Sequence, residues 1–465
     1  MNDRDHEAVV SIKARVADDR KNWLSRRQVL KASTAAAVAA VAATYQPKDV
    51  FADVSGDITL YFAEGKRWGD TQRAVAPLFN KAYPNVNINF AGQPISDFFQ
   101  TVIARMSVKA PDFDVTYIDW GRFPGIHSVG AMSSIEGRMA EDQGWADDYA
   151  VDVPAQVSDL YRIPGGPGGE LHGLTADGNL MTTFYRKDVF EAKGIPYPTN
   201  WDQAIDASKE LHDPENGQYG HISCFQRGAW AGSVFWGVHA TCGGWWFDKM
   251  EAGGWNPAFA TDAGYEALRA LEQLMKYAHP VSFNATEDEC NKAFAAGNAV
   301  YGPLTWGTAV LNDASFTEFH DRMFIDLPPA GKSPGSGQKP QMGGLGQFLN
   351  KYGDNQDAAW AYMKYFNSGD YTDPAIGDAI VAAGGQPARA SVLKRNQDHN
   401  FLAGLYRGFP LSVGYLMQIP EANAIQALMG EEAADFVNGD KDIDAALKAM
   451  DTRTRRLMED GGYYG

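Results

Sequence analysis

The sequence is poor in the residues that hold metals or form disulfide frameworks. Its 465 residues include three cysteines, and its nine histidines are scattered without a C-x-x-C, C-x-x-C-H or H-E-x-x-H motif. We therefore expect no zinc, haem or iron–sulfur site, no other metal and no cofactor. An oxidising compartment permits one disulfide among Cys224, Cys242 and Cys290. Cys224 and Cys242 are the closer pair along the chain, but spacing alone leaves the pairing open.

Positive charge and long apolar runs are also scarce. Asp and Glu number 58 against 41 Lys and Arg, which gives a formal net charge of −17. Such an acidic chain argues against a nucleic-acid partner, because phosphates require a basic patch, and against adhesion to anionic lipid. We find no run of 18 apolar residues, so we expect a soluble mature protein.

Residues 1–52 have the features of an export signal rather than of a folded domain. Residues 25–31 (SRRQVLK) match the twin-arginine pattern, an alanine-rich run follows at 32–44, and residues 50–52 (VFA) offer a cleavage site before Asp53. The pattern predicts export of an already folded protein to the periplasm. The alternative is an alanine-rich helix that follows two arginines by chance.

The mature chain begins with alternating strand and helix patterns. We expect strands at 57–62, 86–90 and 114–118 and helices at 70–80 and 95–108. This β-α-β-α-β order predicts an α/β fold with a doubly wound sheet, in which ligands bind beyond the carboxyl ends of the strands. Two such ends carry polar and aromatic residues: Glu64, Lys66, Arg67 and Trp68 after the first strand, and Asp119, Trp120 and Arg122 after the third. The alternative is that these are ordinary residues of a solvated rim.

The middle of the chain mixes turn signals with tryptophans. Residues 163–169 (IPGGPGG) predict a surface loop near a crossing between lobes, and 171–186 hold strand-like segments separated at 175–179. Four tryptophans, Trp230, Trp236, Trp245 and Trp246, fall within residues 223–247. Because four such rings are hard to bury together, we expect at least one to face a ligand. Helices are expected at 187–194, at 201–211 with Thr199 as N-cap, and at 262–279.

Residues 291–306 (NKAFAAGNAVYGPLTW) predict a device that presents an aromatic ring. A helix ends at Gly297-Asn298, a short strand follows at 299–301, and a turn at Gly302-Pro303 leads to Trp306. Residues 286–289 (TEDE) predict a capping box for this helix, which removes the need to interpret the acidic triplet as a metal site. Beyond it we expect strands at 323–327 and 343–349, a helix at 355–366 and a strong turn at 384–389.

In this order the landmarks resemble those of the solute-binding proteins of bacterial sugar-importing ABC transporters, the group that includes the maltose-binding protein. Three places carry the resemblance over nearly the whole mature chain: FYRKDVF at 184–190 with GIP at 194–196 and TNWD at 199–202; FAAGNA at 294–299 with Gly302, Pro303 and Trp306; and Gly343-Gly344 with AAW at 358–360 and GQPAR at 385–389. The sequence departs from the family's glycine-proline-tryptophan turn, because Leu304 and Thr305 separate Pro303 from Trp306.

The resemblance implies a two-lobed periplasmic-binding-protein fold, each lobe an α/β sheet flanked by helices and joined to the other by hinge strands. Lobe I would comprise residues 53–165 and 345–390, and lobe II residues 166–344 and 391–465. It further implies a monomer that closes over a ligand in the cleft, has no catalytic activity, and hands the ligand to permease subunits in the inner membrane.

The candidate residues have the chemistry that sugar binding requires. Flat rings cover the apolar face of a pyranose, while charged and amide groups bond its hydroxyls. The candidate ligand-binding residues are Glu64, Lys66, Trp68, Asp119, Trp120, Arg122, Asp177, Asn179, Trp230, Trp245, Trp306, Gly344 and Arg389. Two alternatives stay open. One is a receptor for another solute, such as a polyamine or glycerol phosphate, with Lys66, Arg67, Arg122 and Arg389 as cations for an anion. The other is a periplasmic glycosidase that uses Asp119 and Glu64.

Overall fold

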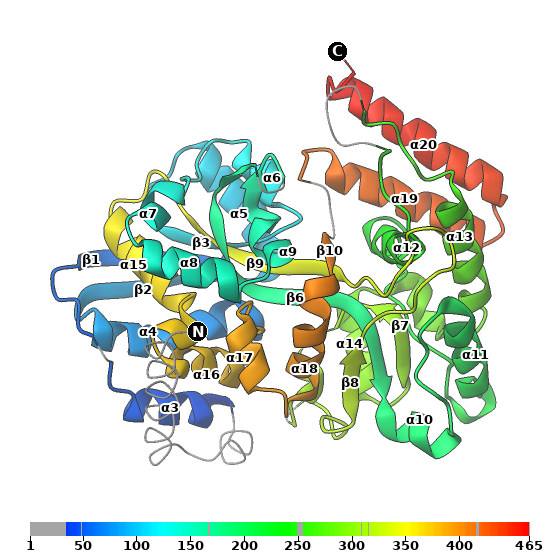
Figure 1. Cartoon of the computed structure of the whole chain (residues 1–465), viewed down its shortest axis with the longest axis horizontal. Coiled ribbons are helices and arrows are strands. Elements are labelled where there is room, and N and C mark those ends of the chain that lie inside the picture. The colour runs from blue at the N-terminus through cyan, green and yellow to red at the C-terminus, as the bar shows by residue number, and fades with distance from the viewer. Residues whose placement is uncertain are drawn as a thin grey trace, which may run out of the picture.

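The computed structural model describes residues 34–47, 49–165, 168–248, 254–307, 309–314, 316–414 and 418–464. Two α/β lobes lie side by side and are joined by long strands that run from one into the other (Figure 1). The twin-arginine motif at 25–31 lies outside the described residues. No helix in the described ranges is both long and apolar enough to cross a bilayer.

Lobe I begins with the predicted β-α-β-α-β unit. Its elements are β1 (Ser55–Ala63), α4 (Thr71–Ala82), β2 (Asn85–Gln93), α5 (Ile95–Ser107) and β3 (Val115–Asp119). The strand β1 lies between β2 and β3 and is parallel to both. The carboxyl ends of β1 and β3 therefore open toward the same edge of the sheet, as the sequence predicted.

Two long strands connect the lobes: β6 (Gly173–Arg186) and β9 (Gln341–Leu349). They pair antiparallel, and β9 also pairs with β3, while the far end of β6 pairs with β7 (Tyr301–Thr305) and β8 (Met323–Asp326). A short strand, β10 (Val413–Gly414), adds to β9. The prediction of separate strand segments within 171–186 was wrong: β6 is continuous, and the polar residues at 175–179 produce only a register shift between Thr175 and Asp177.

Helices flank the sheet in both lobes (Figure 1). Lobe I carries α6 (Phe123–His127), α7 (Glu136–Ala140), α8 (Gln143–Asp152), α9 (Ala155–Ser158), α15 (Gln356–Phe366), α16 (Pro374–Ala382) and α17 (Ala390–Arg395). Lobe II carries α10 (Lys187–Lys193), α11 (Trp201–Leu211), α12 (Ala229–Thr241), α13 (Asp262–Met275), α14 (Glu287–Ala295), α18 (Asn400–Gly408), α19 (Ala422–Val437) and α20 (Ile443–Asp460). The exact residue bounds of the two lobes stay a prediction.

The alanine-rich run forms a helix, α3 (Thr34–Thr44), that packs against α4 and α16 of lobe I. Lys81 Nζ donates to the carbonyl oxygens of Ala42, at 2.9 Å, and Tyr45, at 2.7 Å. The Tyr45 hydroxyl is 2.8 Å from that of Tyr365. The segment that the sequence assigns to the export signal therefore has specific contacts with the folded lobe.

Two local predictions fail for identifiable reasons. The N-cap of α11 is Asn200, whose side chain accepts from Gln203 N at 3.0 Å, whereas Thr199 instead donates to the Gln203 side chain. Gly302 and Pro303 lie inside β7 rather than in a turn. Proline is tolerated there because β7 is an edge strand and its register with β6 is irregular at this point.

The capping box at the start of α14 is confirmed. Thr286 N donates to Glu289 Oε2 at 2.9 Å, and the Thr286 hydroxyl oxygen accepts from the first turn of the helix. Because Thr286 and Glu289 satisfy this helix end, Glu287 is left without a capping role.

The three cysteines are buried thiols. Cys224 Sγ lies 3.0 Å from Cys290 Sγ and 3.1 Å from the Thr305 hydroxyl, whereas Cys242 ends α12 beside Gly331. The two thiols that meet are thus 66 residues apart, and the pair that is closer in sequence does not meet.

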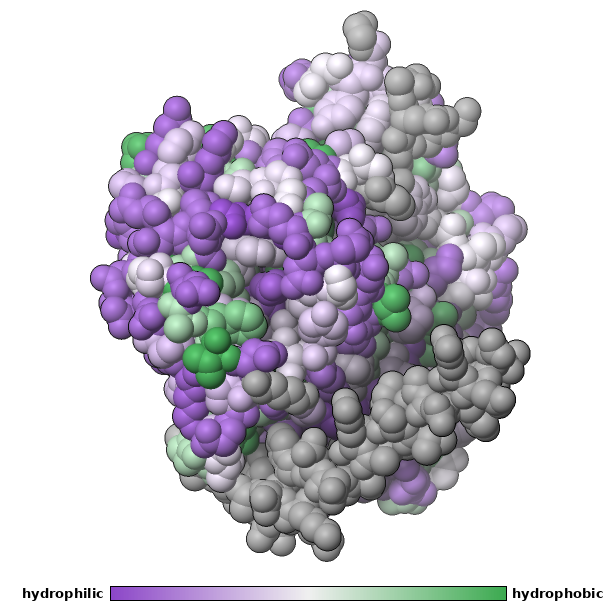
Figure 2. Space-filling view, turned by 60° about the vertical axis from the view of Figure 1, so that its left-hand side comes forward, coloured by the Kyte–Doolittle hydropathy of each residue, from purple (hydrophilic) through white to green (hydrophobic). Residues whose placement is uncertain are grey.

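The surface agrees with the acidic composition. Figure 2 shows a face that is mostly hydrophilic, with apolar colour confined to small patches. Most large aromatic side chains lie inside, among them Trp145, Trp236 and Trp246.

Candidate functional site

Three charged side chains from different parts of the chain converge where the lobes meet. Arg67 lies in a π-helical turn (Lys66–Asp70) directly after β1, and its Nη2 is 2.5 Å from Oδ1 of Asp177 on β6. Its Nη1 is 4.0 Å from Oε1 of Glu287, the first residue of α14. Arg67 therefore connects the loop after β1, a strand shared by the lobes, and a helix of lobe II.

Burial and charge oppose one another within this cluster. Burial raises the pKa of Asp177, and the adjacent Arg67 guanidinium opposes that rise. The pKa of Glu287 is likewise raised by burial and lowered less strongly by Arg67. Burial would lower the pKa of Arg67, but Asp177 and Glu287 together outweigh it, so its pKa lies above the usual value. The guanidinium is therefore held as a buried cation by two carboxyl groups.

The turn at 384–389 closes one side of the cluster. Gln386 N donates to Oδ2 of Asp177 at 3.1 Å, and Gly178 N donates to the Gln386 carbonyl at 2.8 Å. The side-chain amide of Gln386 is buried without a hydrogen-bond partner among the described residues, as are the Tyr161 hydroxyl, Asn291 Oδ1 and Arg67 Nε. Buried polar groups are normally hydrogen-bonded, so each of these atoms is a candidate for a contact with a polar ligand.

Trp120 and Trp306 flank the crossing of β6 and β9. Trp120 follows β3, donates its backbone N–H to the Gly344 carbonyl at 3.1 Å, and is 1% exposed. Trp306 follows β7, donates Nε1–H to the Ser233 hydroxyl at 2.8 Å, and is 6% exposed.

Close packing at this crossing depends on Gly343 and Gly344. A Cβ at Gly343 would lie 2.9 Å from Trp306 Cη2, and one at Gly344 would lie 2.6 Å from the Asp177 carbonyl oxygen. Asn179 pairs with Gly343 in the ladder, and its side chain accepts from Leu180 N at 2.9 Å. The structure thus brings five predicted residues to one place: Trp120, Asp177, Asn179, Trp306 and Gly344.

Other predicted residues lie on the rim of lobe I. Glu64 bonds both Nη atoms of Arg73, at 2.7 and 2.8 Å. Asp119 pairs with Arg122 at 2.6 Å, and the Arg122 guanidinium lies 3.9 Å from the centre of the Phe99 ring. The half-buried Trp68 packs edge-on against Phe99 and Tyr117. Lys66 begins the π-helical turn, but its side chain lies outside what the structure describes.

Trp230 and Trp245 belong to lobe II. Trp230 is half-buried in the first turn of α12, and Trp245 packs edge-on against the buried Trp236 at 5.4 Å. Trp245 is 36% exposed, so it offers a ring to solvent where Trp236 and Trp246 do not.

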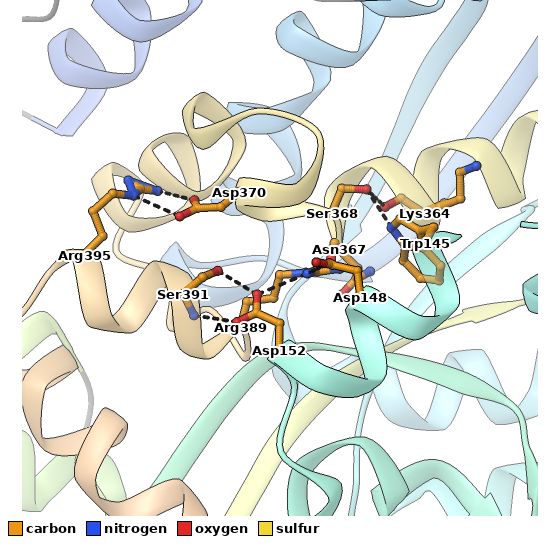
Figure 3. Close-up of polar contacts among 10 residues, drawn as sticks. All are labelled: Trp145, Asp148, Asp152, Lys364, Asn367, Ser368, Asp370, Arg389, Ser391 and Arg395. Carbon is orange, nitrogen blue, oxygen red and sulfur yellow. Dashed lines mark hydrogen bonds and ion pairs between the residues drawn. The ribbon is translucent and has the colours of Figure 1, made fainter. Parts of the chain in front are cut away.

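Arg389 lies in a polar network inside lobe I (Figure 3). It is 4% exposed; its Nη1 contacts the carboxylates of Asp148 and Asp152 on α8, and its Nε donates to the Asn367 carbonyl at 2.5 Å. This places the side chain against α8 rather than beside Arg67. Its position at the end of the 384–389 turn indicates that it anchors the turn carrying Gln386.

The sequence did not single out several members of the cluster. Glu287 was assigned to a capping box, and Asn291, Tyr161 and Gln386 carried no signal beyond neighbouring turns or helices. Arg67 was noted at the carboxyl end of the first strand and as a possible partner for an anion. Its pairing with Asp177 joins residues 110 positions apart, which no local pattern reveals.

Comparison with known proteins identifies the family to which this two-lobed chain belongs. The sequence model of the family described as bacterial extracellular solute-binding protein matches residues 63–372. The chain belongs to this family. The resemblance inferred from its motifs is thereby confirmed, and the family is one of substrate-binding proteins rather than enzymes.

Relatives of this solute-binding protein cover almost its whole length. A mannitol-binding protein of Pseudomonas aeruginosa is 23% identical over 417 residues, which is 84% of this chain and 90% of the relative. A solute-binding protein from Agrobacterium radiobacter K84, solved in complex with ribitol, superposes with a TM-score of 0.71 at 20% identity and covers 89% of this chain and 100% of its own. One from Thermotoga lettingae, bound to α-D-tagatose, gives 0.71 at 17% identity, with 87% and 100% covered. These superpositions confirm the two-lobed α/β fold.

Proposed function

We propose that this solute-binding protein captures a neutral sugar or polyol between its lobes and delivers it to the permease of an ABC importer. The observation that carries the proposal is the buried Arg67–Asp177 pair at the junction of the lobes, with the Gln386 backbone bonded to Asp177 and Glu287 of lobe II facing Arg67. Relatives that bind mannitol, ribitol and tagatose support a polyhydroxylated ligand.

The chemistry of the cluster fits a chain or ring of hydroxyl groups. Each hydroxyl donates one hydrogen bond and accepts others, so it needs donors and acceptors side by side. Arg67 supplies donors, Asp177 and Glu287 supply acceptors, and the Gln386 amide supplies both. Trp120 and Trp306 lie at the β6–β9 crossing that also carries Asp177, and their buried rings would offer a carbohydrate apolar surface once the lobes open.

An anionic ligand receives less support from the structure. Of the four cations that the sequence offered for an anion, Arg67 is held by Asp177, Arg122 by Asp119, and Arg389 by Asp148 and Asp152. A phosphate or carboxylate would have to compete with these carboxylates for the same guanidinium groups.

A glycosidase receives no support from its proposed carboxylates. Glu64 is bonded to Arg73 and Asp119 to Arg122, each within lobe I. A general acid needs a raised pKa, whereas Arg73 lowers the pKa of Glu64. We therefore propose binding without catalysis.

We also propose that the protein works in the periplasm after export by the twin-arginine route. The motif at 25–31 and the cleavage site after Ala52 support this route. We propose that it acts as a monomer that permease subunits in the inner membrane recognise in its closed form.

A thermal-shift screen followed by calorimetry tests the proposed ligand class. The probes are D-mannitol, ribitol, D-tagatose and maltose, with spermidine and glycerol 3-phosphate as the competing classes. We expect a neutral compound to raise the melting temperature, since a ligand that binds only the folded state stabilises it. Binding of spermidine or glycerol 3-phosphate alone would overturn the proposal.

Variants of Arg67 test the site itself. Arg67→Met combined with Asp177→Asn removes both charges of the short ion pair together, and it leaves Glu287, a quarter of whose side chain is accessible, as the one acid of the cluster. We expect a loss of affinity of at least 100-fold with the fold retained. Arg105→Met is the matched control, because Arg105 on α5 is also in lobe I and is ion-paired with the exposed Asp112 in the loop that follows. Equal affinity of the double variant and the control would place the ligand elsewhere.

A further inference from the structure

The first two turns of α14 contribute two polar side chains of lobe II to the region around Arg67. Glu287 reaches within 4.0 Å of Arg67 Nη1, and Asn291 lies one turn further along the same face of the helix, with its Oδ1 buried and without a partner among the described residues. The start of α14 does not require Glu287, because Thr286 and Glu289 form the capping box. The hydrogen bonds of the helix end therefore do not require Glu287, and its carboxylate faces the junction of the lobes.

The cluster around Arg67 holds more acidic groups than basic ones. One guanidinium faces two carboxylates, and the short contact goes to Asp177, which is buried, while a quarter of the Glu287 side chain remains accessible. An anion that approaches Arg67 from the side of lobe II meets Glu287 first. Like charges in a partly desolvated site repel strongly, so this arrangement disfavours anions.

The distance between Glu287 and Arg67 gives Glu287 a second role. Its oxygen and Arg67 Nη1 are 4.0 Å apart, which is too far for a direct hydrogen bond. A neutral hydroxyl that approaches the two groups from the side can accept from Arg67 and donate to Glu287, and the Asn291 side chain can bond its neighbour. A ligand hydroxyl would thus complete a chain of contacts from lobe I to lobe II.

We propose that Glu287, with Asn291 beside it on the same helix face, selects neutral polyhydroxylated ligands and rejects their anionic counterparts, such as sugar phosphates and sugar acids. This inference rests on the proposed function and deepens it, since it assigns the choice between neutral and anionic solutes to a residue of lobe II.

Calorimetry of charge-changing variants tests the assignment. The probes are D-mannitol, ribitol and D-tagatose against D-mannitol 1-phosphate and D-gluconate. In the wild type we expect the best neutral ligand to bind at least 100-fold more tightly than either anion. Glu287→Gln keeps size and shape but removes the charge, so we expect at least tenfold weaker binding of the neutral ligand and at least a tenfold smaller preference over the anions.

Asp288→Asn is the matched control. Asp288 is an exposed acid in the same first turn of α14, so its loss has the same effect on net charge and on the helix end. We expect its preference to stay within twofold of the wild type. Asn291→Asp adds a carboxylate beside Glu287 and should increase the rejection of anions, which keeps the test informative if Glu287→Gln folds poorly.

The outcomes separate this inference from the proposed function. If the wild type binds a neutral ligand but Glu287→Gln and Asn291→Asp keep its preference, the selective role of Glu287 is wrong and the proposed function stands. If the wild type binds no neutral ligand, the proposed function itself fails.

Discussion

Burial shifts the protonation of some residues in this protein away from its usual range, and His239 is an example outside the binding site. Its ring stacks on Phe235 in α12 and packs against Phe259, with no exposed surface. Burial lowers the pKa of His239 to about 3, and the same cause lowers that of His221 to about 3. Both histidines are therefore neutral in the folded protein at any pH at which it works.

These depressed pKa values predict acid sensitivity with a definite sign. Between about pH 6.5 and pH 3 the unfolded chain binds protons that the folded chain refuses, so stability is complete above that window and falls as the pH falls through it. Each histidine should cost about 2 kcal/mol between pH 7 and pH 5. Urea unfolding of the wild type and of His239→Met at pH 7, 6 and 5 measures the effect.

The difference between the two proteins isolates His239 from the other titrating groups. His239→Met should lose about 2 kcal/mol less stability than the wild type between pH 7 and pH 5. Identical slopes would mean that His239 is protonated inside the fold.

Among the elements, β9 determines how the two lobes and the binding site fit together. It pairs with β3 on one side and β6 on the other, and its Gly343-Gly344 step allows Trp306 and the Asp177 backbone to approach. The sequence indicated Gly344 as a ligand-binding residue; the structure shows its backbone between Trp120 and Asp177. Its lack of a side chain is what the site requires.

We expect Gly344→Ala to damage stability and binding together. The added Cβ would lie 2.6 Å from the Asp177 carbonyl oxygen, and a backbone atom cannot move aside without disturbing the β6–β9 ladder. Overpacking of this kind costs about 1–3 kcal/mol. Gly137→Ala in α7 is the control, because a Cβ there meets nothing within 4 Å. Differential scanning calorimetry and ligand titration of both variants give the comparison, and an unchanged Gly344→Ala protein would contradict it.

The elements also show what the sequence can predict. The strands and helices of residues 55–119 follow from apolar periodicity, and the capping box of α14 follows from Thr286 and Glu289. Pro303 was misplaced because a proline predicts a turn unless one knows that its strand lies at the edge of a sheet. Arg67, Asp177 and Glu287 meet through packing of distant segments, so spacing along the chain held no information about the cluster.

At the scale of the whole molecule, the described residues of the two lobes touch at several places. They include the Arg67–Glu287 approach, a hydrogen bond of 3.4 Å from Gln156 Nε2 on α9 to the Pro410 carbonyl, and one of 3.0 Å from Asn423 Nδ2 on α19 to the carbonyl of Gly121, in the loop after β3. Two-lobed proteins with hinge strands exchange between open and closed arrangements, and contacts across the lobes favour the closed one.

Asn423→Ala should therefore weaken ligand binding without touching the ligand. Loss of one hydrogen bond of about 0.5–1.5 kcal/mol from the closed form raises Kd about two- to tenfold. The melting temperature without ligand should change little, because Asn423 lies on the surface between lobes. Calorimetry gives Kd, and small-angle scattering should show a smaller radius of gyration with ligand than without. An unaltered Kd would mean that the contact does not contribute to closure.

The oxidation state of the buried thiol pair, Cys224 and Cys290, would show whether the chain folds before or after it is exported. A thiolate is the species that exchanges with disulfides, and burial raises the pKa of the Cys290 thiol and so suppresses it. A chain that folds in a reducing compartment before export encloses both sulfurs before it meets an oxidant; a chain that folds after export meets the oxidant first. Alkylation under denaturing conditions and mass spectrometry of the mature protein would therefore find three alkylated cysteines if the chain folds before export. They would find one if the chain folds after export and forms a disulfide. The number of free thiols would therefore show whether the protein folds before or after it crosses the membrane.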